Sequence, residues 1–152
     1  MIKILFICHG NICRSPMAEY LMKELVSEKN IAEDFLIGSA ATSSEELGNP
    51  VYPPVQKILN DRGISCKGKH AVQLKRSDYE KYDLFIGMDS ENLRNMKRLF
   101  GGDPENKVSL LLDYTDHPRN VADPWYTRNF HEAEADIECG CKALLEYLLK
   151  KR

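Results

Sequence analysis

The chain has 152 residues, of which 43% are hydrophobic, enough for one domain that buries a sizeable core unaided. Its 21 Lys and Arg against 23 Asp and Glu give a net charge of −2, which argues against the global basic field of a nucleic-acid-binding protein. We therefore expect residues 1–152 to form a single domain that acts on a small or local anionic group.

Apolar segments alternate with helical patterns along the chain, which is typical of a parallel sheet covered by helices on both faces. The predicted strands are residues 2–8, 35–40, 84–88 and 108–112. The predicted helices are residues 17–27, 54–62, 77–81, 91–100 and 132–149. The first two and the last have apolar positions at helical spacing. The fold class is therefore predicted to be α/β.

Two long loops, residues 39–52 and 113–128, are rich in Ser, Gly, Pro and Asp. In an open α/β sheet, ligands bind at the carboxyl ends of the strands, where both loops begin. Loops of this length in a compact domain are often functional, so we expect them to border a site.

The segment CHGNICRS at residues 8–15 places a thiol and a guanidinium at the two ends of a short loop between the first strand and the first helix. Ser15-Pro16 predicts the helix start, with Ser as the cap and Pro in the first helical position. Gly10 and Asn11 tolerate the positive φ angles of a tight cradle, whose N–H groups can surround a tetrahedral oxyanion. The predicted phosphate-binding residues are His9, Gly10, Asn11, Ile12, Cys13 and Ser15.

Cys8 is the candidate nucleophile, because a neighbouring helix N-terminus and an arginine favour the thiolate. Arg14 can bind two phosphoryl oxygens at once and neutralise charge in the transition state. Ser15 can hydrogen-bond the sulfur as it leaves. This chemistry needs no metal and no cofactor. The alternative is a structural cysteine buried at a strand end with an arginine nearby.

A phosphate ester also needs an acid to protonate its leaving group, and Asp123 is the best candidate. It precedes Pro124, which favours an extended backbone at Asp123 and stiffens the loop. Trp125 and Tyr126 can form the wall of a pocket for a flat ring. An Asp-Pro pair is also common at an ordinary turn. The residue types leave these rivals open as the acid: Asp83, Asp89, Asp103, Asp113 and Asp116.

No apolar run approaches the length of a membrane span, and no cleavage site of small residues follows the N-terminal apolar stretch. The five cysteines are odd in number and lack paired zinc-ligand spacing. We therefore expect a cytoplasmic protein with reduced thiols and with neither a membrane nor a nucleic-acid partner. A monomer is the favoured oligomeric state.

The chain closely resembles the low-molecular-weight protein tyrosine phosphatases. The matching segments follow the family's order: CHGNICRSPMAE at 8–19, GSA at 38–40 with Thr42, IGMD at 86–89 with Asn92 and Leu93, and DPWY at 123–126 with Phe130. The resemblance implies a three-layer α/β/α fold with a four-stranded parallel sheet, flavodoxin-like and doubly wound. It also implies that phosphotyrosine proteins or small aryl phosphates are the substrates.

By the same resemblance, Cys8 is the nucleophile, Arg14 the phosphate clamp and Asp123 the general acid. Asn11 would be left-handed with His70 as a partner behind the loop, and Cys13 would trap oxidised Cys8 as a disulfide.

Two positions depart from the family pattern. Trp125 stands where many members carry a tyrosine, and Ala71, Val72 and Gln73 follow His70 where many carry an arginine.

Two alternatives share the loop. A thioredoxin-coupled arsenate reductase needs two further cysteines a few residues apart, and none lies between Cys66 and Cys139. A non-catalytic phosphate-binding module would lack the nucleophile or the acid, and this chain carries candidates for both.

Overall fold

The computed structural model describes residues 1–151 and is built on a sheet of four parallel strands. The strands are β1 (Ile2–Cys8), β2 (Phe35–Ala41), β3 (Leu84–Gly87) and β4 (Val108–Leu110), in the order β2-β1-β3-β4. This is the order of doubly wound, flavodoxin-like sheets, whose ligands bind where neighbouring connections diverge. Here that point lies between the carboxyl ends of β1 and β3.

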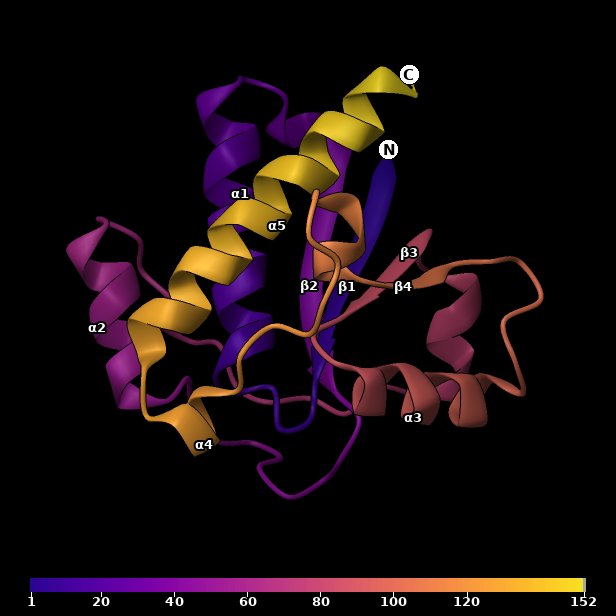
Figure 1. Ribbon diagram of the computed structural model, residues 1–152, viewed down its shortest axis with the longest axis horizontal. Helices are drawn as coiled ribbons and strands as arrows, with labels where there is room; N and C mark the ends of the chain where they lie inside the picture. Colours follow the sequence, from indigo (N-terminus) through magenta and orange to yellow (C-terminus); the bar gives the residue numbers. More distant parts are fainter. Residues whose placement is uncertain (152) are drawn as a thin grey trace.

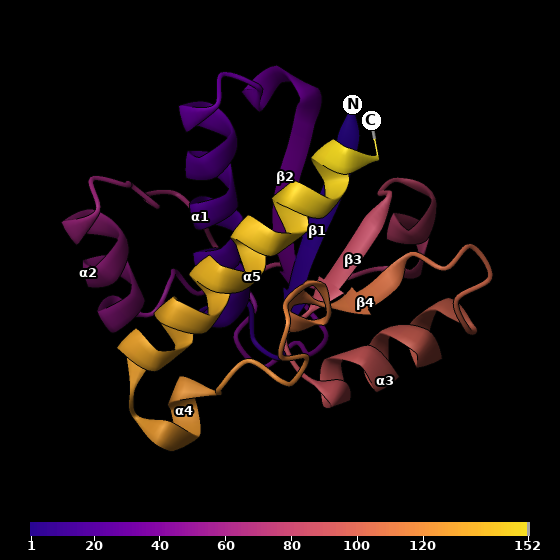
Figure 2. The same ribbon diagram turned by 45° about the horizontal axis from the view of Figure 1, so that its top comes forward.

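Helices cover both faces of the sheet (Figures 1 and 2). On one face lie α1 (Arg14–Glu28), α2 (Pro53–Asp61) and α5 (Phe130–Lys150), with α5 packed across α1. On the other lie α3 (Ser90–Phe100) and the 3-10 helix η2 (Arg76–Glu80). The remaining short elements are η1 (Ala32–Asp34), η3 (Leu111–Tyr114) and α4 (Pro124–Thr127). The predicted α/β/α fold is confirmed.

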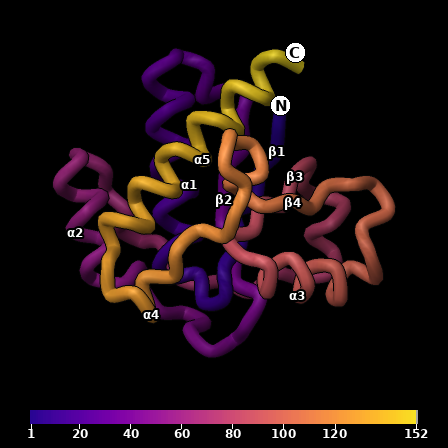
Figure 3. Tube along the Cα trace, in the orientation of Figure 1, coloured from indigo at the N-terminus to yellow at the C-terminus, as the bar shows by residue number. Residues whose placement is uncertain are grey.

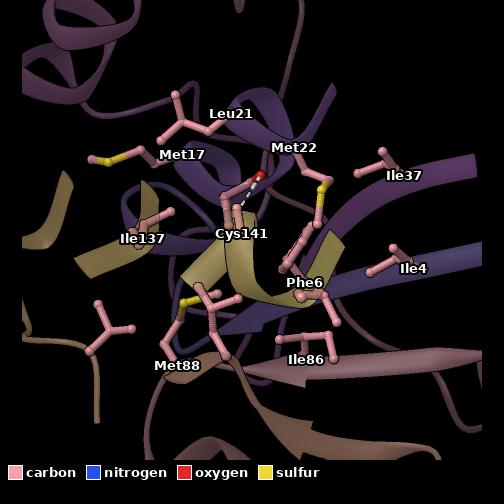
Figure 4. Close-up of a cluster of buried hydrophobic side chains, with 14 of the residues drawn as sticks. Ile4, Phe6, Met17, Leu21, Met22, Ile37, Ile86, Met88, Ile137 and Cys141 are labelled. Atoms are coloured by element: carbon pink, nitrogen blue, oxygen red, sulfur yellow. Dashed lines mark hydrogen bonds between the residues drawn. The ribbon is translucent and has the colours of Figure 1, made fainter. Parts of the chain in front are cut away.

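Successive residues of β1 pack into different layers, because side chains alternate across a strand. Ile4 and Phe6 point toward α1 and α5. They pack in one buried cluster with Ile86 of β3 and Met22 of α1 (Figure 4). Leu5 and Ile7 belong to a second buried cluster with side chains of η2 and α3. Since β1 is central and buried on both faces, its apolar run fixes the position of the loop that follows.

The first helix starts differently from the prediction. Helix α1 begins at Arg14, and its N-cap, Cys13, makes no side-chain capping bond. The predictions of Ser15 as the cap and of Pro16 as the first helical residue are therefore wrong. The Ser15 hydroxyl instead faces inward, toward Cys8 and Asn11. The helix thus carries the arginine in its own first turn.

The loop predicted for residues 113–128 contains the short helix α4. Asp123 is its N-cap, accepting a hydrogen bond at Oδ1 from the Trp125 N–H at 3.0 Å, and Pro124 is its first residue. The strand predicted for residues 108–112 ends at Leu110, because η3 follows directly. The strand predicted for residues 84–88 ends at Gly87, and the helix predicted for 54–62 begins and ends one residue earlier.

The loops after β1 and β2 gather at one end of the molecule, where α4 also lies (Figure 3). This end carries the carboxyl termini of the parallel strands, as predicted. Among residues 1–151, none of the helices combines the length and the apolar character needed to cross a bilayer.

Candidate active site

The segment that follows β1 folds back toward Cys8. Asn11 has a φ of 60°, as the resemblance implied, and its backbone N–H lies 3.3 Å from the Cys8 sulfur. The sequence reasoning allowed a positive φ at Gly10 as well, but Gly10 does not adopt one. A close contact favours glycine at this position instead, because a Cβ there would lie 3.2 Å from Cγ of Glu46. The loop therefore needs a left-handed residue at only one of the two positions.

The Asn11 side chain holds the loop from behind. Its Nδ2 donates to Ser15 Oγ at 2.7 Å and to Ser39 Oγ at 3.0 Å, and its Oδ1 accepts from the Val72 N–H at 3.1 Å. The implied contact with His70 is wrong. The side-chain amide of Asn11 bonds to the three groups above, while His70 is exposed and forms an isolated β-bridge with Pro50.

Cys8 is 3% exposed and lies at the base of the loop. Its Sγ is in hydrogen-bond contact with Ser15 Oγ at 3.1 Å. Because Ser15 Oγ already accepts from Asn11, its own hydrogen is free to point at the sulfur. The Ser15 hydroxyl is therefore placed to donate a hydrogen bond to the sulfur.

Arg14 is buried against two carboxylates. Its Nη2 lies 2.8 Å from Asp89 Oδ2 and 3.4 Å from Asp123 Oδ2, and its Nη1 donates to the Val121 carbonyl at 3.1 Å. Burial alone favours a neutral group, but the negative charges of Cys8, Asp123 and Asp89 outweigh it and raise the pKa of Arg14. The guanidinium is thus fixed in orientation and fully charged beside the thiol.

Asp123 lies across the opening from the loop, with an extended backbone (φ −88°, ψ 108°) as Pro124 predicted. One carboxylate oxygen caps α4 and the other faces Arg14. Asp89 was an open rival for the acid. Its Oδ1 accepts from the Asn92 N–H at 2.9 Å, capping α3, while its Oδ2 holds Arg14. Both carboxylates therefore make one cap contact and one contact with Arg14. They differ in exposure and in distance from the guanidinium: the Asp123 side chain is 32% exposed and lies 3.4 Å from Arg14, whereas that of Asp89 is 21% exposed and lies 2.8 Å away.

A cleft of about 360 Å³ joins these groups. Its lining comprises Cys8, His9, Gly10, Ile12, Cys13, Arg14, Glu45, Glu46, Asp89, Glu91, Asn92, Asp123, Trp125 and Tyr126. Trp125 packs edge-on against Tyr52, with ring centroids 5.4 Å apart, and Tyr126 is 83% exposed. The cleft thus has a thiol and a guanidinium at its base and aromatic rings at its rim.

The family model described as "Low molecular weight phosphotyrosine protein phosphatase" matches residues 3–152. The chain belongs to this family. It is 37% identical to low molecular weight protein-tyrosine-phosphatase YfkJ of Bacillus subtilis, over 100% of this chain and 99% of that protein. It is 35% identical to PtpA of Staphylococcus aureus strain MRSA252, over 99% and 96%.

The crystal structure of Bacillus subtilis YfkJ superposes with a TM-score of 0.96 at 37% identity, covering 100% of this chain and 97% of that one. The family membership makes the chain a phosphatase and confirms the predicted class of enzyme. It decides against the arsenate reductase and the non-catalytic module that the loop alone also allowed.

The remaining predicted loop residues of this phosphatase, His9, Ile12 and Cys13, line the cleft. The exposed His9 ring pairs with Glu45, with Nε2 and Oε2 3.0 Å apart. Burial and the negative charge of Cys8 raise the pKa of Cys13 to about 12. Cys13 is therefore a neutral thiol at physiological pH. The Ile12 carbonyl accepts from the Tyr52 N–H at 2.9 Å, which ties the loop to the start of α2.

The sequence reasoning did not assign roles to Ser39 and Glu19, both of which are buried behind the loop of this phosphatase. Ser39 lies within a segment used for the resemblance, but only the pairing of β1 with β2, which sets Phe6 opposite Ser39, brings it to Asn11. Glu19, on α1, accepts from Ser39 Oγ. Glu19 is the last residue of another segment used for the resemblance, but only the fold brings it to Ser39.

Proposed function

We propose that this phosphatase hydrolyses phosphotyrosine through a covalent phosphocysteine on Cys8, with Arg14 as the phosphate clamp and Asp123 as the general acid and base. One observation carries the proposal: thiol, guanidinium and carboxylate line one cleft, and Arg14 lies 3.4 Å from Asp123. A phosphoryl group bound at Arg14 is thereby close to both the attacking sulfur and the proton donor.

In the first step, the Cys8 thiolate attacks phosphorus and the bond between phosphorus and the phenolic oxygen breaks. The phenolate takes the proton of the Asp123 carboxylic acid and leaves as a phenol. Arg14 binds two of the phosphoryl oxygens, and the backbone N–H groups of the loop bind the charge that develops in the transition state.

In the second step, water attacks the phosphorus of the phosphocysteine. The Asp123 carboxylate takes a proton from this water, and the bond between sulfur and phosphorus breaks. Cys8 leaves as a thiolate, which the Ser15 hydroxyl stabilises from 3.1 Å away. The products are inorganic phosphate and the enzyme in its starting form.

We propose phosphotyrosine proteins and small aryl phosphates as the substrates. Trp125 and Tyr126 stand at the rim, so a phosphate must be carried on a long side chain to reach Cys8. The flat ring of phosphotyrosine also packs against aromatic rings, and phosphoserine is too short for either requirement.

We also propose that residues 1–152 form one phosphatase domain that works as a monomer in the cytoplasm. All residues of the cleft come from one chain, so a single copy has the complete set. The free thiols of Cys8, Cys13, Cys66, Cys139 and Cys141 suit a reducing compartment. Light scattering of the purified protein tests the monomer.

The test is the pair Cys8→Ser and Arg14→Lys, assayed with p-nitrophenyl phosphate. Cys8→Ser should abolish turnover but retain phosphate binding, since a serine hydroxyl has no base to activate it. Arg14→Lys should also fail, because an ammonium cannot bind two oxygens in a plane. Turnover by Cys8→Ser at a rate near that of the unmodified enzyme would refute the proposal. Urea unfolding checks that both variants fold.

A further inference from the structure

Asp136 is a buried charged group that the proposed mechanism does not use. It belongs to α5, and its side chain is 10% exposed. Its two oxygens bind the Arg119 guanidinium as a pair: Oδ2 accepts from Nη1 at 3.0 Å, and Oδ1 accepts from Nη2 at 2.6 Å. Oδ2 also accepts from the Ala122 N–H at 3.2 Å. One carboxylate on α5 therefore holds the backbone at the residue directly before Asp123.

The partners of Asp136 keep it charged and fixed in orientation. Burial favours the neutral acid, but the hydrogen bonds from Arg119 and from the Ala122 N–H outweigh burial and lower the pKa of Asp136. A bidentate pair between a carboxylate and an arginine also restricts the geometry of both groups. Arg119 Nη1 donates in addition to the Asn120 carbonyl at 3.0 Å, so the guanidinium folds back on its own segment.

The segment that Asp136 holds is the connection between η3 and α4, which forms no helix or strand of its own. Its course therefore depends on contacts with other elements. The Val121 N–H donates to the Met88 carbonyl at 2.8 Å, next to the end of β3. Asn120 Oδ1 accepts from the Ser90 N–H at 3.1 Å, at the start of α3. Asp136 adds an attachment to α5, and it is the attachment that lies next to the acid.

The position of this segment affects the geometry of the cleft. The Val121 carbonyl accepts from Arg14 Nη1 at 3.1 Å, and Asp123 Oδ2 lies 3.4 Å from Arg14 Nη2. A shift of the segment therefore moves the acid relative to the guanidinium that binds the phosphoryl group. Proton transfer needs a close approach of donor and acceptor, and a displacement of about 1 Å can cost roughly 10²-fold in rate.

We propose that Asp136 is a positioning residue of this phosphatase: by holding Arg119 and the Ala122 N–H, it keeps the Asp123 carboxyl within reach of the leaving oxygen of a bound ester. This inference rests on the proposed role of Asp123 as the general acid. Without the Asp136 carboxylate, the Ala122 N–H and the Arg119 guanidinium lose their partner on α5. The acid is then less well placed, whereas the Cys8 sulfur keeps its own contacts.

The experiment compares kcat/KM for phenyl phosphate and for p-nitrophenyl phosphate. The two esters carry a ring of the same size, but p-nitrophenol is the more acidic phenol, so its ester depends less on the acid. The ratio of the two kcat/KM values therefore reports the acid, while a general disturbance of the cleft lowers both values together. Asp136→Ala should lower kcat/KM for phenyl phosphate about tenfold more than for p-nitrophenyl phosphate, which is part of the 10² to 10⁴, roughly, that general acid catalysis contributes.

Glu134 provides a matched control on the same helix. Its side chain is 15% exposed, and its Oε2 lies 2.6 Å from Arg62 Nε, so it also pairs with an arginine. Of the described residues, neither Glu134 nor Arg62 is among those that line the active-site cleft. Glu134→Ala should therefore keep the ratio of the unmodified enzyme. A change in this ratio as large as that in Asp136→Ala would overturn the inference, because the effect would then come from α5 as a whole.

A double substitution tests the route of the effect. If Asp136 acts through Asp123, then Asp136→Ala should not change the ratio further in the Asp123→Asn background. A further change of the ratio there would overturn the inference, as would equal losses on both esters in Asp136→Ala alone. Urea unfolding shows whether Asp136→Ala folds. If it does not, Arg119→Ala replaces it, since the Arg119 side chain is 55% exposed, and an unchanged ratio in that variant overturns the inference.

The inference and the proposed function fail in different ways. If Asp123→Asn lowers kcat/KM equally for both esters, the role of Asp123 as the general acid is wrong. If Asp123→Asn slows phenyl phosphate selectively and Asp136→Ala keeps the ratio of the unmodified enzyme, only the role of Asp136 is wrong.

Discussion

Asp89 performs two tasks with one carboxylate, and substitution can separate them. Its Oδ1 caps α3 and its Oδ2 holds Arg14 at 2.8 Å. Asp89→Asn keeps a good N-cap but removes the charge opposite the guanidinium. Asp89→Ala removes both. The difference in unfolding free energy between the two variants therefore measures the contribution of the cap. The loss in Asp89→Asn alone measures the contribution of the contact with Arg14.

The magnitudes follow from burial. The Arg14 side chain is 4% exposed, so a lost hydrogen bond to it costs about 2 kcal/mol of unfolding free energy. The remaining contacts with Asp123 and Val121 keep the cost below the 3–5 kcal/mol, roughly, of a fully broken buried pair. Asp89→Ala should lose about 1 kcal/mol more, because the N-cap is also gone.

Urea unfolding of the two variants checks these values, and p-nitrophenyl phosphate hydrolysis checks the effect on catalysis. A less constrained Arg14 should lower kcat/KM for both variants, roughly tenfold to a hundredfold. Asp113→Asn, which alters an exposed 3-10 cap contacting the Leu110 N–H, is the control and should retain full activity. Equal stability and activity of Asp89→Asn and the unmodified enzyme would refute the reasoning.

Further predictions concern the acid, the rim and the second loop cysteine. Asp123→Asn should slow phosphotyrosine hydrolysis by about 10² to 10⁴ but slow esters of acidic phenols much less; equal losses on both would contradict its role as acid. Trp125→Ala should lower kcat/KM for aryl phosphates roughly tenfold and spare small alkyl phosphates. Mild peroxide should inactivate the enzyme reversibly through a disulfide between Cys8 and Cys13, and peptide mapping that pairs Cys8 with another cysteine would disprove this. Because the pKa of Cys13 is raised from 9.0 to about 12, its contribution to stability is complete below pH 9 and is lost as pH rises toward 12. Urea unfolding should therefore show that the unfolding free energy falls less from pH 8 to pH 10 in Cys13→Ala than in the unmodified enzyme.

The parts of the site that lie close together in sequence were the predictable ones. Cys8, Asn11 and Arg14 share one loop, and the apolar run of β1 with the helix after it fixes where that loop lies. The α/β alternation was likewise readable from local periodicity. Local rules failed only in detail, as at Ser15, because the inward hydrogen bonds of its hydroxyl outweigh a capping role at the helix start.

The remaining parts depend on contacts between distant segments. Asp123 and Asp89 lie 109 and 75 positions from Arg14, so the residue types alone left several aspartates open. Ser39 reaches Asn11 through the register of β1 and β2. No spacing rule gives such a pairing, since it depends on how the whole sheet assembles.

The most direct test of the account is to stop the reaction within milliseconds and locate the phosphate by mass spectrometry. Asp123→Ala with an ester of an acidic phenol is suited to this, because its first step needs little acid and its second step lacks the base. The account predicts phosphate on the Cys8 sulfur, and no phosphoenzyme in Cys8→Ser. Phosphate bound covalently to any other residue, or burst kinetics that persist in Cys8→Ser, would contradict it.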